Sequence, residues 1–205
     1  MALRILITAL ACYFLGNHNG AICVSVMLHD DVRNHGSGNA GLTNFIRNYG
    51  AQRSLMVIAI DVGKAVLACL LGSLMFPEYP IAGKVLGGLA VMLGPAFPAL
   101  QGFRGGKGIL SGFIISLMID WRVGLLIAVV FFTAYLLTKY VSLGSVLAAV
   151  AFGIGFWVLY PHDVLVISGT SFMSVLTIFQ HRANIIRLVK GQERKTNLLG
   201  KGKKQ

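Results

Sequence analysis

Seven stretches of apolar residues leave this chain little choice of environment. An α-helix needs about 20 apolar residues to cross the hydrocarbon core of a bilayer, and fewer where the flanking chain is buried in protein. Only 12% of the residues are charged, against about a quarter in an ordinary soluble domain. The sequence therefore predicts an all-α, polytopic integral membrane bundle of about seven transmembrane helices, with six as the alternative count. The stretches are residues 2–28, 55–76, 81–97, 108–119, 123–138, 143–160 and 164–179.

Three features of these stretches depart from a simple series of uninterrupted spans. The first is broken by the polar segment "GNHNG" at residues 16–20, and the fourth has only about twelve residues, which is typical of a short or partly re-entrant helix. The division between the fifth and sixth depends on "TKYVS" alone. We expect one membrane-embedded domain over residues 1–205, with a cytoplasmic helix and a basic tail in residues 180–205.

The net charge of +11, from 18 Lys and Arg against 7 Asp and Glu, would suggest nucleic-acid binding in a soluble protein. No basic helix or aromatic ladder stands outside the apolar stretches, so we expect no nucleic-acid partner. Cytoplasmic loops of membrane proteins collect Lys and Arg. With the carboxyl end inside, the inner segments hold fourteen of the eighteen basic residues, and the orientation is predicted as amino terminus outside and carboxyl terminus cytoplasmic. The inner segments are then 29–54, 98–107, 139–142 and 180–205.

Three polar stretches fall on this predicted cytoplasmic side. They read "GSGNAGLTNFIR" (residues 36–47), "GPAFPALQGFRGGKGILS" (residues 94–111) and "QHRANIIRLVKGQERK" (residues 180–195). Such glycine-, amide- and cation-rich segments are unexpected in so apolar a chain. Because all three are predicted on one side of the membrane, they can converge on a single site.

The second stretch contains "GFRGGKG", four glycines and two cations in seven residues. Glycine lets successive backbone N–H groups turn toward one point, and such a nest binds an anion. The amino end of the helix predicted to start near Gly108 adds its dipole, and Lys107 adds a full charge. The stretch lacks the strand and spacing of a Walker A loop. The alternative is a flexible loop with ordinary positive-inside residues.

The first stretch offers neutral hydrogen-bond donors and one planar cation. Ser37, Asn39, Thr43 and Asn44 are the donors, and the guanidinium of Arg47 suits phosphate. If a helix begins here, Thr43 and Arg47 lie one turn apart on one face. Thr43 or Asn44 could instead cap that helix. For Asn44 we favour a structural role.

In the third stretch, His181 and Asn184 are three residues apart and share a helix face, and Gly191 is expected to end the helix. His181 is a candidate ligand of an anionic substrate, or a proton acceptor near neutral pH. The alternative is an ordinary histidine at the membrane interface. Asp61 and Lys64, one turn apart within the second span, are predicted to form a buried ion pair rather than to bind substrate.

The chain offers no carboxylate cluster for a metal ion, since the adjacent Asp30 and Asp31 point different ways on a helix. We therefore expect no metal and no cofactor. A site rich in donors and poor in general bases suits reactants that bring their own negative charge and their own leaving group.

The three stretches resemble the motifs of the bacterial membrane glycerol-3-phosphate acyltransferases that use acyl phosphate, the PlsY type. Those motifs read approximately GSGNxGxTNxxR, GH-x-FP leading into F-K-GGKG, and HRxNIxRLxxGxE. The first and third match nearly throughout, and their order and spacing agree along almost the whole chain. The chain departs from the pattern at Pro95, where the family usually has histidine, and at Arg104, which replaces lysine. "GNHNGA" stands where the first span usually has a Ser-Ile-Pro-type turn.

The resemblance implies transfer of an acyl chain from acyl phosphate to the 1-hydroxyl of sn-glycerol 3-phosphate, giving 1-acylglycerol 3-phosphate and phosphate. It implies a bacterial cytoplasmic membrane location with the active site on the cytoplasmic side, and partners limited to these substrates and membrane lipid. It assigns catalysis to His181, Lys107 and Ser37. By motif match, glycerol 3-phosphate is assigned to Ser37, Arg47, Lys107, His181 and Asn184, and acyl phosphate to Gly105, Gly106, Gly108, Asn39 and Thr43.

Two other classes of function share a basic inner face. A small-anion transporter would carry polar residues through the membrane midplane and show related halves. An acyltransferase that uses acyl-CoA would show a larger cytosolic surface for the nucleotide.

Overall fold

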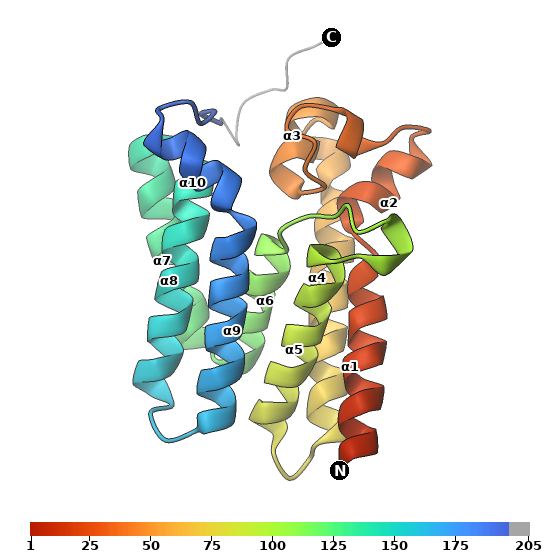
Figure 1. The fold of residues 1–205 in the computed structure, drawn as a ribbon, viewed down its shortest axis with the longest axis vertical. Coiled ribbons are helices and arrows are strands. Elements are labelled where there is room, and N and C mark those ends of the chain that lie inside the picture. Colours follow the sequence, from red (N-terminus) through yellow and green to blue (C-terminus); the bar gives the residue numbers. More distant parts are fainter. Residues whose placement is uncertain (197–205) are drawn as a thin grey trace.

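The computed structural model describes residues 1–196, and the part of the predicted basic tail in residues 197–205 lies outside the described residues. The described chain consists of helices and the loops that join them (Figure 1). The α-helices are α1 (Ala2–Asn17), α2 (Gly20–Met27), α3 (Leu42–Tyr49), α4 (Ala51–Met75), α5 (Pro80–Ala96), α6 (Ile109–Ile119), α7 (Trp121–Thr138), α8 (Val141–Leu159), α9 (Val164–Gln180) and α10 (Arg182–Val189). Two 3-10 turns, η1 (Val32–Asn34) and η2 (Ala99–Gln101), lie in the loops.

Every predicted apolar stretch contains a helix, which confirms the all-α membrane fold. In the described chain α4, α7, α8 and α5 together with η2 are long and apolar enough to cross a membrane. The pairs α1–α2 and α9–α10 also pass when taken together, and they are bent by 42° and 54°. The predicted short fourth stretch is α6, with 11 residues. We treat α1 and α9 as the spanning parts of the bent pairs.

The predicted interruption of the first span is a true break between α1 and α2. Asn19 is the N-cap of α2. The Nζ of Lys64 lies 2.7 Å from Asp61 Oδ1 and donates to the carbonyl of His18 at 3.2 Å, while Asp61 accepts the N–H of Gly20 at 3.1 Å. The predicted ion pair is therefore confirmed. The pair forms hydrogen bonds with backbone groups that the broken helix leaves without partners. Backbone groups without hydrogen bonds cost free energy inside a membrane.

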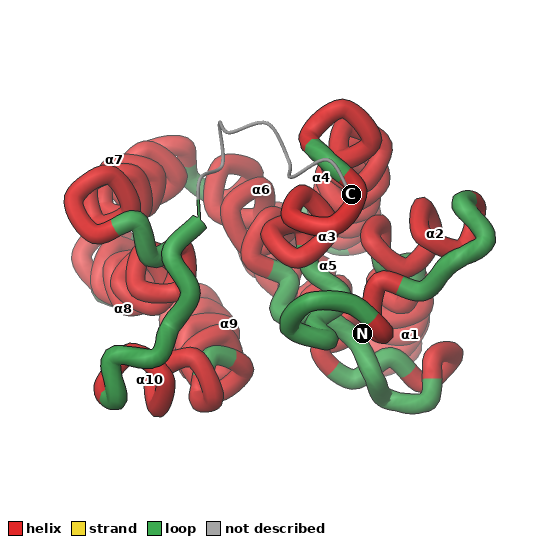
Figure 2. The backbone as a smooth tube through the Cα atoms, turned by 90° about the horizontal axis from the view of Figure 1, so that it is seen from above, coloured by secondary structure: helices red, strands yellow, loops and turns green. Residues whose placement is uncertain are grey.

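The helices form two groups, α1–α5 and α7–α10, with α6 between them (Figure 2). In the first group glycines bring backbones into contact, as where Gly16 meets Gly94 and where Gly72 meets Gly83. In the second group α8 packs against both α7 and α9. Helix α9 contacts α5, and α6 contacts α4, α5 and α7, so these helices join the two groups.

The three polar stretches meet at one end of the bundle. Helices α2, α3 and α10 and the loop before α6 lie at the end opposite to the amino terminus, while the turns α4–α5 and α8–α9 lie at the end of the amino terminus (Figure 1). The fold thus brings together three segments that are separated by long stretches of sequence.

Candidate active site

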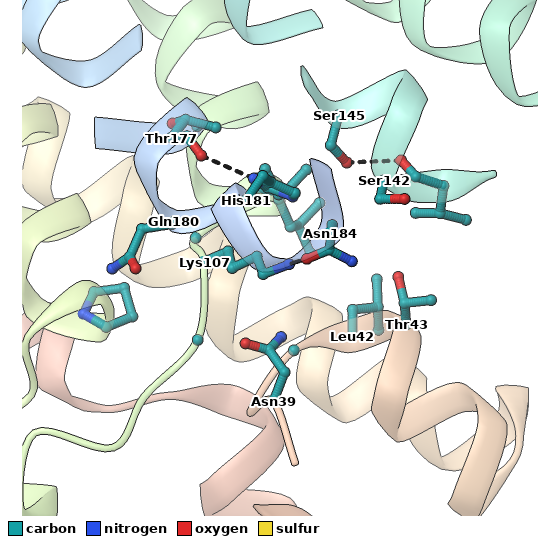
Figure 3. A pocket seen from close by; sticks show the side chains of 18 of the residues that line it. Asn39, Leu42, Thr43, Lys107, Ser142, Ser145, Thr177, Gln180, His181 and Asn184 are labelled. Carbon is teal, nitrogen blue, oxygen red and sulfur yellow. Dashed lines mark hydrogen bonds between the residues drawn. The ribbon is translucent and has the colours of Figure 1, made fainter. Parts of the chain in front are cut away.

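A cavity of about 1020 Å³ opens between the two groups of helices. Its lining includes all ten residues singled out from the sequence, so the three polar stretches do converge (Figure 3). These residues are Ser37, Asn39, Thr43, Arg47, Gly105, Gly106, Lys107, Gly108, His181 and Asn184.

The first stretch is held in place by Asn44. Its Oδ1 accepts the N–H of Ser37 at 3.0 Å, and its Nδ2 donates to the carbonyls of Val32 and His35 at 3.1 and 3.0 Å. The structural role favoured for Asn44 is therefore confirmed. The alternative that Thr43 or Asn44 caps the helix is wrong, because α3 begins at Leu42 with a glycine at its N-cap and no side-chain cap.

The second stretch approaches its neighbours so closely that only glycine fits. A Cβ on Gly105 would lie 2.0 Å from the carbonyl oxygen of Pro95, and one on Gly106 would lie 2.1 Å from that of Ala40. The N–H of Gly106 donates to Pro95 at 2.9 Å. Gly108, with φ +66°, is the N-cap of α6, as predicted. Packing and hydrogen bonding hold the loop in place, which argues against the flexible-loop alternative.

Lys107 joins the glycine loop to the third stretch. Its Nζ donates to Oδ1 of Asn184, whose Nδ2 donates to Glu193 Oε1 at 2.8 Å (Figure 3). Glu193 also accepts from Ser142 Oγ at 2.9 Å and from Arg187 Nε at 2.8 Å. Burial lowers the pKa of Lys107 to about 8. The ammonium is thus poorly solvated in the cavity and well placed to gain from a bound anion.

Glu193 was missed by the sequence analysis. Burial alone would raise its pKa, but hydrogen bonds from Asn184, Arg187 and Ser142 hold the pKa below the usual value. The carboxylate is therefore ionised, and it orients the Asn184 amide so that its oxygen faces Lys107. Two signals were available: Glu193 is the final position of the third motif, and it is an acidic residue within the basic "RLVKGQERK" segment.

His181 directly follows the end of α9 and is 2% exposed. Its Nδ1 lies 2.8 Å from the carbonyl oxygen of Thr177. Since a carbonyl only accepts, Nδ1 carries the hydrogen, and in the neutral ring Nε2 carries the lone pair. Burial, and secondly the charge of Lys107, lower the pKa of His181 to about 4. The ring is therefore neutral at physiological pH.

Arg47 reaches across the cavity to the end of the described chain. It donates to Oγ1 of Thr196 and to the carbonyl of Arg194 at 3.4 Å. Burial, and then the charge of Arg194, lower its pKa. The carbonyl of Thr196 accepts from Tyr135 Oη at 3.1 Å, and its N–H donates to Lys139 at 3.0 Å. The sequence analysis missed Thr196, because a contact between residues 47 and 196 leaves no local pattern.

Below the polar end, the cavity is lined by apolar side chains from α5 to α9. An apolar extension beside a cluster of anion-binding groups is the shape needed by a ligand with a charged head and a hydrocarbon chain. The apolar lining includes Met92, Phe113, Ile127, Phe131, Phe152 and Met173.

The fold and the cavity define an integral membrane protein with a donor-rich site at one end of its helices. Residues 6–191 match the family model described as glycerol-3-phosphate acyltransferase. The glycerol-3-phosphate acyltransferase of Finegoldia magna is 37% identical over 194 residues, which cover 94% of this chain and 96% of that protein. The enzyme of the same name from Clostridioides difficile is 36% identical over 198 residues, covering 93% and 94%.

The fold is also similar to two crystal structures of PlsY (YgiH), an integral membrane glycerol 3-phosphate acyltransferase. The glycerol 3-phosphate form has a TM-score of 0.85 at 28% identity, and the lysophosphatidic acid form has a TM-score of 0.82 at 27% identity. Each comparison covers 95% of this chain and 96% of the other. The chain belongs to the glycerol-3-phosphate acyltransferase family, the PlsY family, as the sequence motifs predicted.

Proposed function

We propose that the protein transfers an acyl chain from acyl phosphate to the 1-hydroxyl of sn-glycerol 3-phosphate. The observation that carries this proposal is the convergence of three donor-rich stretches on one cavity that continues into an apolar space. Both substrates are phosphorylated, and the donor also carries a hydrocarbon chain. The names of the two similar crystal forms, with glycerol 3-phosphate and with lysophosphatidic acid, support the acceptor and the product.

The principal task of the site is to bring together two anions that repel each other. Lys107 and Arg47 supply positive charge, and Ser37, Asn184 and neutral His181 supply hydrogen-bonding groups for glycerol 3-phosphate. The backbone amides of Gly105 and Gly108, with the amino end of α6, suit the head of the acyl phosphate, while Gly106, whose N–H donates to Pro95, shapes the loop; Asn39 and Thr43 line the same cavity. Holding both reactants in line removes most of the entropic barrier to attack.

In the reaction, the 1-hydroxyl oxygen attacks the acyl carbon, and the bond between that carbon and the phosphate oxygen then breaks. Lys107 and the loop amides stabilise the negative charge that develops on the carbonyl oxygen. Because the leaving group is phosphate, the enzyme needs no covalent intermediate. Acyl phosphate is therefore a better match to this site than acyl-CoA, whose thiolate leaving group and nucleotide would need other contacts.

The hydroxyl proton needs an acceptor. His181 with its bare Nε2 is one candidate, but a pKa of about 4 makes the imidazole a weak base. A phosphate oxygen, with a second pKa of about 6, is the stronger base. We therefore assign proton transfer to a phosphate oxygen of the substrate and substrate binding to His181. His181→Gln tests this assignment, because a loss of turnover at saturating substrate would return the role of base to the histidine.

The charge distribution supports a bacterial cytoplasmic membrane location with the site on the cytoplasmic side. The end of the bundle that holds the cavity also carries Arg33, Arg53, Arg104 and the basic residues of α10, whereas the other end carries Arg4, at the start of α1, and Arg122, at the start of α7. Glycerol 3-phosphate would enter from the cytoplasm, and the acyl chain would enter between helices from the inner leaflet.

The donor is tested by incubating the purified protein with sn-glycerol 3-phosphate and either palmitoyl phosphate or palmitoyl-CoA. We expect lysophosphatidic acid and stoichiometric phosphate from palmitoyl phosphate. Formation of lysophosphatidic acid from palmitoyl-CoA and not from palmitoyl phosphate would show that acyl-CoA is the acyl donor. Uptake of glycerol 3-phosphate into sealed liposomes, without acylation, would favour the transporter alternative.

A further inference from the structure

Two asparagines lie at the break between α1 and α2, and both are almost fully buried. Asn17 is 0% exposed and Asn19 is 3% exposed. A buried amide within a membrane protein is costly unless both of its polar atoms have partners. Here the oxygen and the nitrogen of each amide both have a partner, and the partners show what each residue holds in place.

Asn19 connects the helix break to the first polar stretch. Its Oδ1 accepts the N–H of Ile22 at 3.1 Å, which caps α2. Its Nδ2 donates to the carbonyl oxygen of Ala40 at 2.9 Å. Ala40 lies between Ser37 and Thr43, the two ends of the loop that would contact both substrates. Asn19 and Ala40 both line the cavity.

The carbonyl of Ala40 sits at the junction of the two anion-binding loops. A Cβ added to Gly106 would lie 2.1 Å from the Ala40 oxygen and 3.0 Å from Nδ2 of Asn19. The amide of Asn19 therefore meets both loops at once. A carbonyl oxygen free to turn toward a bound phosphate would repel it, and the Asn19 donor engages that oxygen.

Asn17 is a matched neighbour with a different task. Its Oδ1 accepts the N–H of Leu100 at 3.1 Å, and its Nδ2 donates to the carbonyl of Tyr13 at 2.9 Å. It therefore holds the η2 turn against α1. Within the described chain, the cavity lining includes Asn19 and Ala40 but neither Asn17 nor Leu100.

We propose that Asn19 is a positioning residue for substrate binding: its amide fixes the Ala40 carbonyl, and with it the loop from Ser37 to Thr43, against the glycine loop. The proposal rests on the proposed function, because it takes the bound groups to be phosphates. The residue acts through Ala40 and not by contact with the reacting atoms. No conventional motif marks it, since "GNHNGA" replaces the turn usual in the family.

The test compares Asn19→Ser with Asn17→Ser. Serine at position 19 keeps a hydroxyl that can cap α2 but is too short to reach Ala40. With sn-glycerol 3-phosphate and palmitoyl phosphate, Asn19→Ser is expected to raise the KM for glycerol 3-phosphate about tenfold, with kcat within about threefold of wild type. Asn17→Ser is expected to change this KM less than about twofold while lowering the unfolding temperature.

A wild-type KM in Asn19→Ser, or an equal rise in Asn17→Ser, overturns the proposal. If Asn19→Ser does not fold, Asn19→Thr, a second capping residue without reach to Ala40, replaces it. Hydrogen exchange of residues 36–43 is measured on the same proteins, and it needs no turnover. Faster exchange in Asn19→Ser than in Asn17→Ser supports the positioning role even if the wild type does not acylate glycerol 3-phosphate, and unchanged exchange overturns it. A wild type without acylation activity contradicts only the proposed function.

Discussion

The two groups of helices that bound the cavity differ in how closely their backbones approach one another. In the group α1–α5, backbone meets backbone: a Cβ on Gly72 would lie 2.0 Å from the carbonyl oxygen of Gly83. In the group α7–α10 the approaches are looser: a Cβ on Gly144 would lie 2.9 Å from the carbonyl oxygen of Phe131, and the nearest atoms to one on Gly155 belong to the side chains of Val123 and Leu126, at 3.2 and 3.3 Å. Backbone cannot yield to an added methyl group, whereas side chains can change rotamer.

This difference matches what each group does at the cavity. The first group carries the loops that we propose bind phosphate, whose geometry would have to be held to within about an ångström for attack to occur. The second group, with α6, supplies much of the apolar lining, where a hydrocarbon chain needs volume more than fixed contacts. The more rigidly packed group thus lies beside the proposed sites of the phosphate groups, and the more adaptable group lies beside the proposed site of the hydrocarbon chain.

The largest effect is expected from testing the packing itself. Gly72→Ala forces the α4 and α5 backbones apart and should destabilise the protein by about 3 kcal/mol or more. Gly155→Ala should be within about 1 kcal/mol of wild type, because a small rotamer shift makes room and alanine favours the helix. Thermal unfolding in detergent micelles measures both. Equal destabilisation of the two variants would contradict the contrast between the groups.

The second test concerns Lys107, where the loop of the first group meets Asn184 of the second. Lys107→Met keeps the length of the side chain and removes the charge. We expect kcat/KM for phosphate release to fall about 10²–10³-fold, the usual loss when one donor to a developing oxyanion is removed. The unfolding temperature shows whether the variant is folded. A loss of less than about tenfold in a folded variant would remove Lys107 from the reaction.

The pH dependence of stability tests the burial of His181 in the second group. The folded-state pKa of about 4 lies below the ordinary imidazole value of 6.5, so the unfolded chain binds more protons between these pH values. Stability contributed by the neutral ring is complete above pH 6.5, and at most about 3 kcal/mol is lost as the pH falls to 4. His181→Gln should flatten this part of the curve. Parallel unfolding curves for variant and wild type would show that the ring is solvated.

Arg47 tests how the first group contributes to binding. Arg47→Ala should raise the KM for glycerol 3-phosphate, because a charge-assisted contact is lost. The rise should correspond to a loss of about 1.5–3 kcal/mol of binding free energy, with a smaller change in kcat. Thr196→Val is the matched control, since it removes the partner that Arg47 contacts in the structure but leaves the cation. A KM that is unchanged in Arg47→Ala rejects the assignment.

Features with a local pattern could be predicted from the sequence. The glycines around Lys107 and the spacing of His181 and Asn184 mark an anion site because the backbone geometry they need is specified within a few residues. The break in the first span was also visible, as a polar interruption at residues 16–20. The direction of the bend between α1 and α2 could not be predicted, because the 42° bend depends on contacts from Lys64 and Asp61 on α4.

Long-range polar contacts could not be predicted in this way. Glu193 ends the third motif, but its position in a charged tail is typical of a solvated residue, and its hydrogen bond from Ser142 of α8 leaves no local pattern. Asparagine is a common residue at a helix N-cap, so the sequence alone suggests only that role for Asn19. Its hydrogen bond to the Ala40 carbonyl depends on the fold, which places the loop that contains Ala40 against the break between α1 and α2. In both cases the residue type was consistent with an ordinary structural or solvated role. Only the hydrogen-bond partner in the folded structure points to a role at the cavity.

The smallest effect is expected where the cavity is apolar, at Gly112 of α6. A Cβ there would lie 3.7 Å from Cε of Met92, an ordinary contact distance, so alanine fits but takes up space in the cavity. Gly112→Ala should lower kcat/KM for palmitoyl phosphate about fivefold relative to lauroyl phosphate, since steric discrimination in an apolar pocket amounts to about 1 kcal/mol. Gly63→Ala is the control, because a Cβ at Gly63 meets nothing within 4 Å while the gain in helix propensity is the same. If the ratio of kcat/KM for palmitoyl and lauroyl phosphate is unchanged in Gly112→Ala, the acyl chain does not pass Gly112. The apolar surface that adapts to the acyl chain would then be formed by α7 and α8 and not by α6.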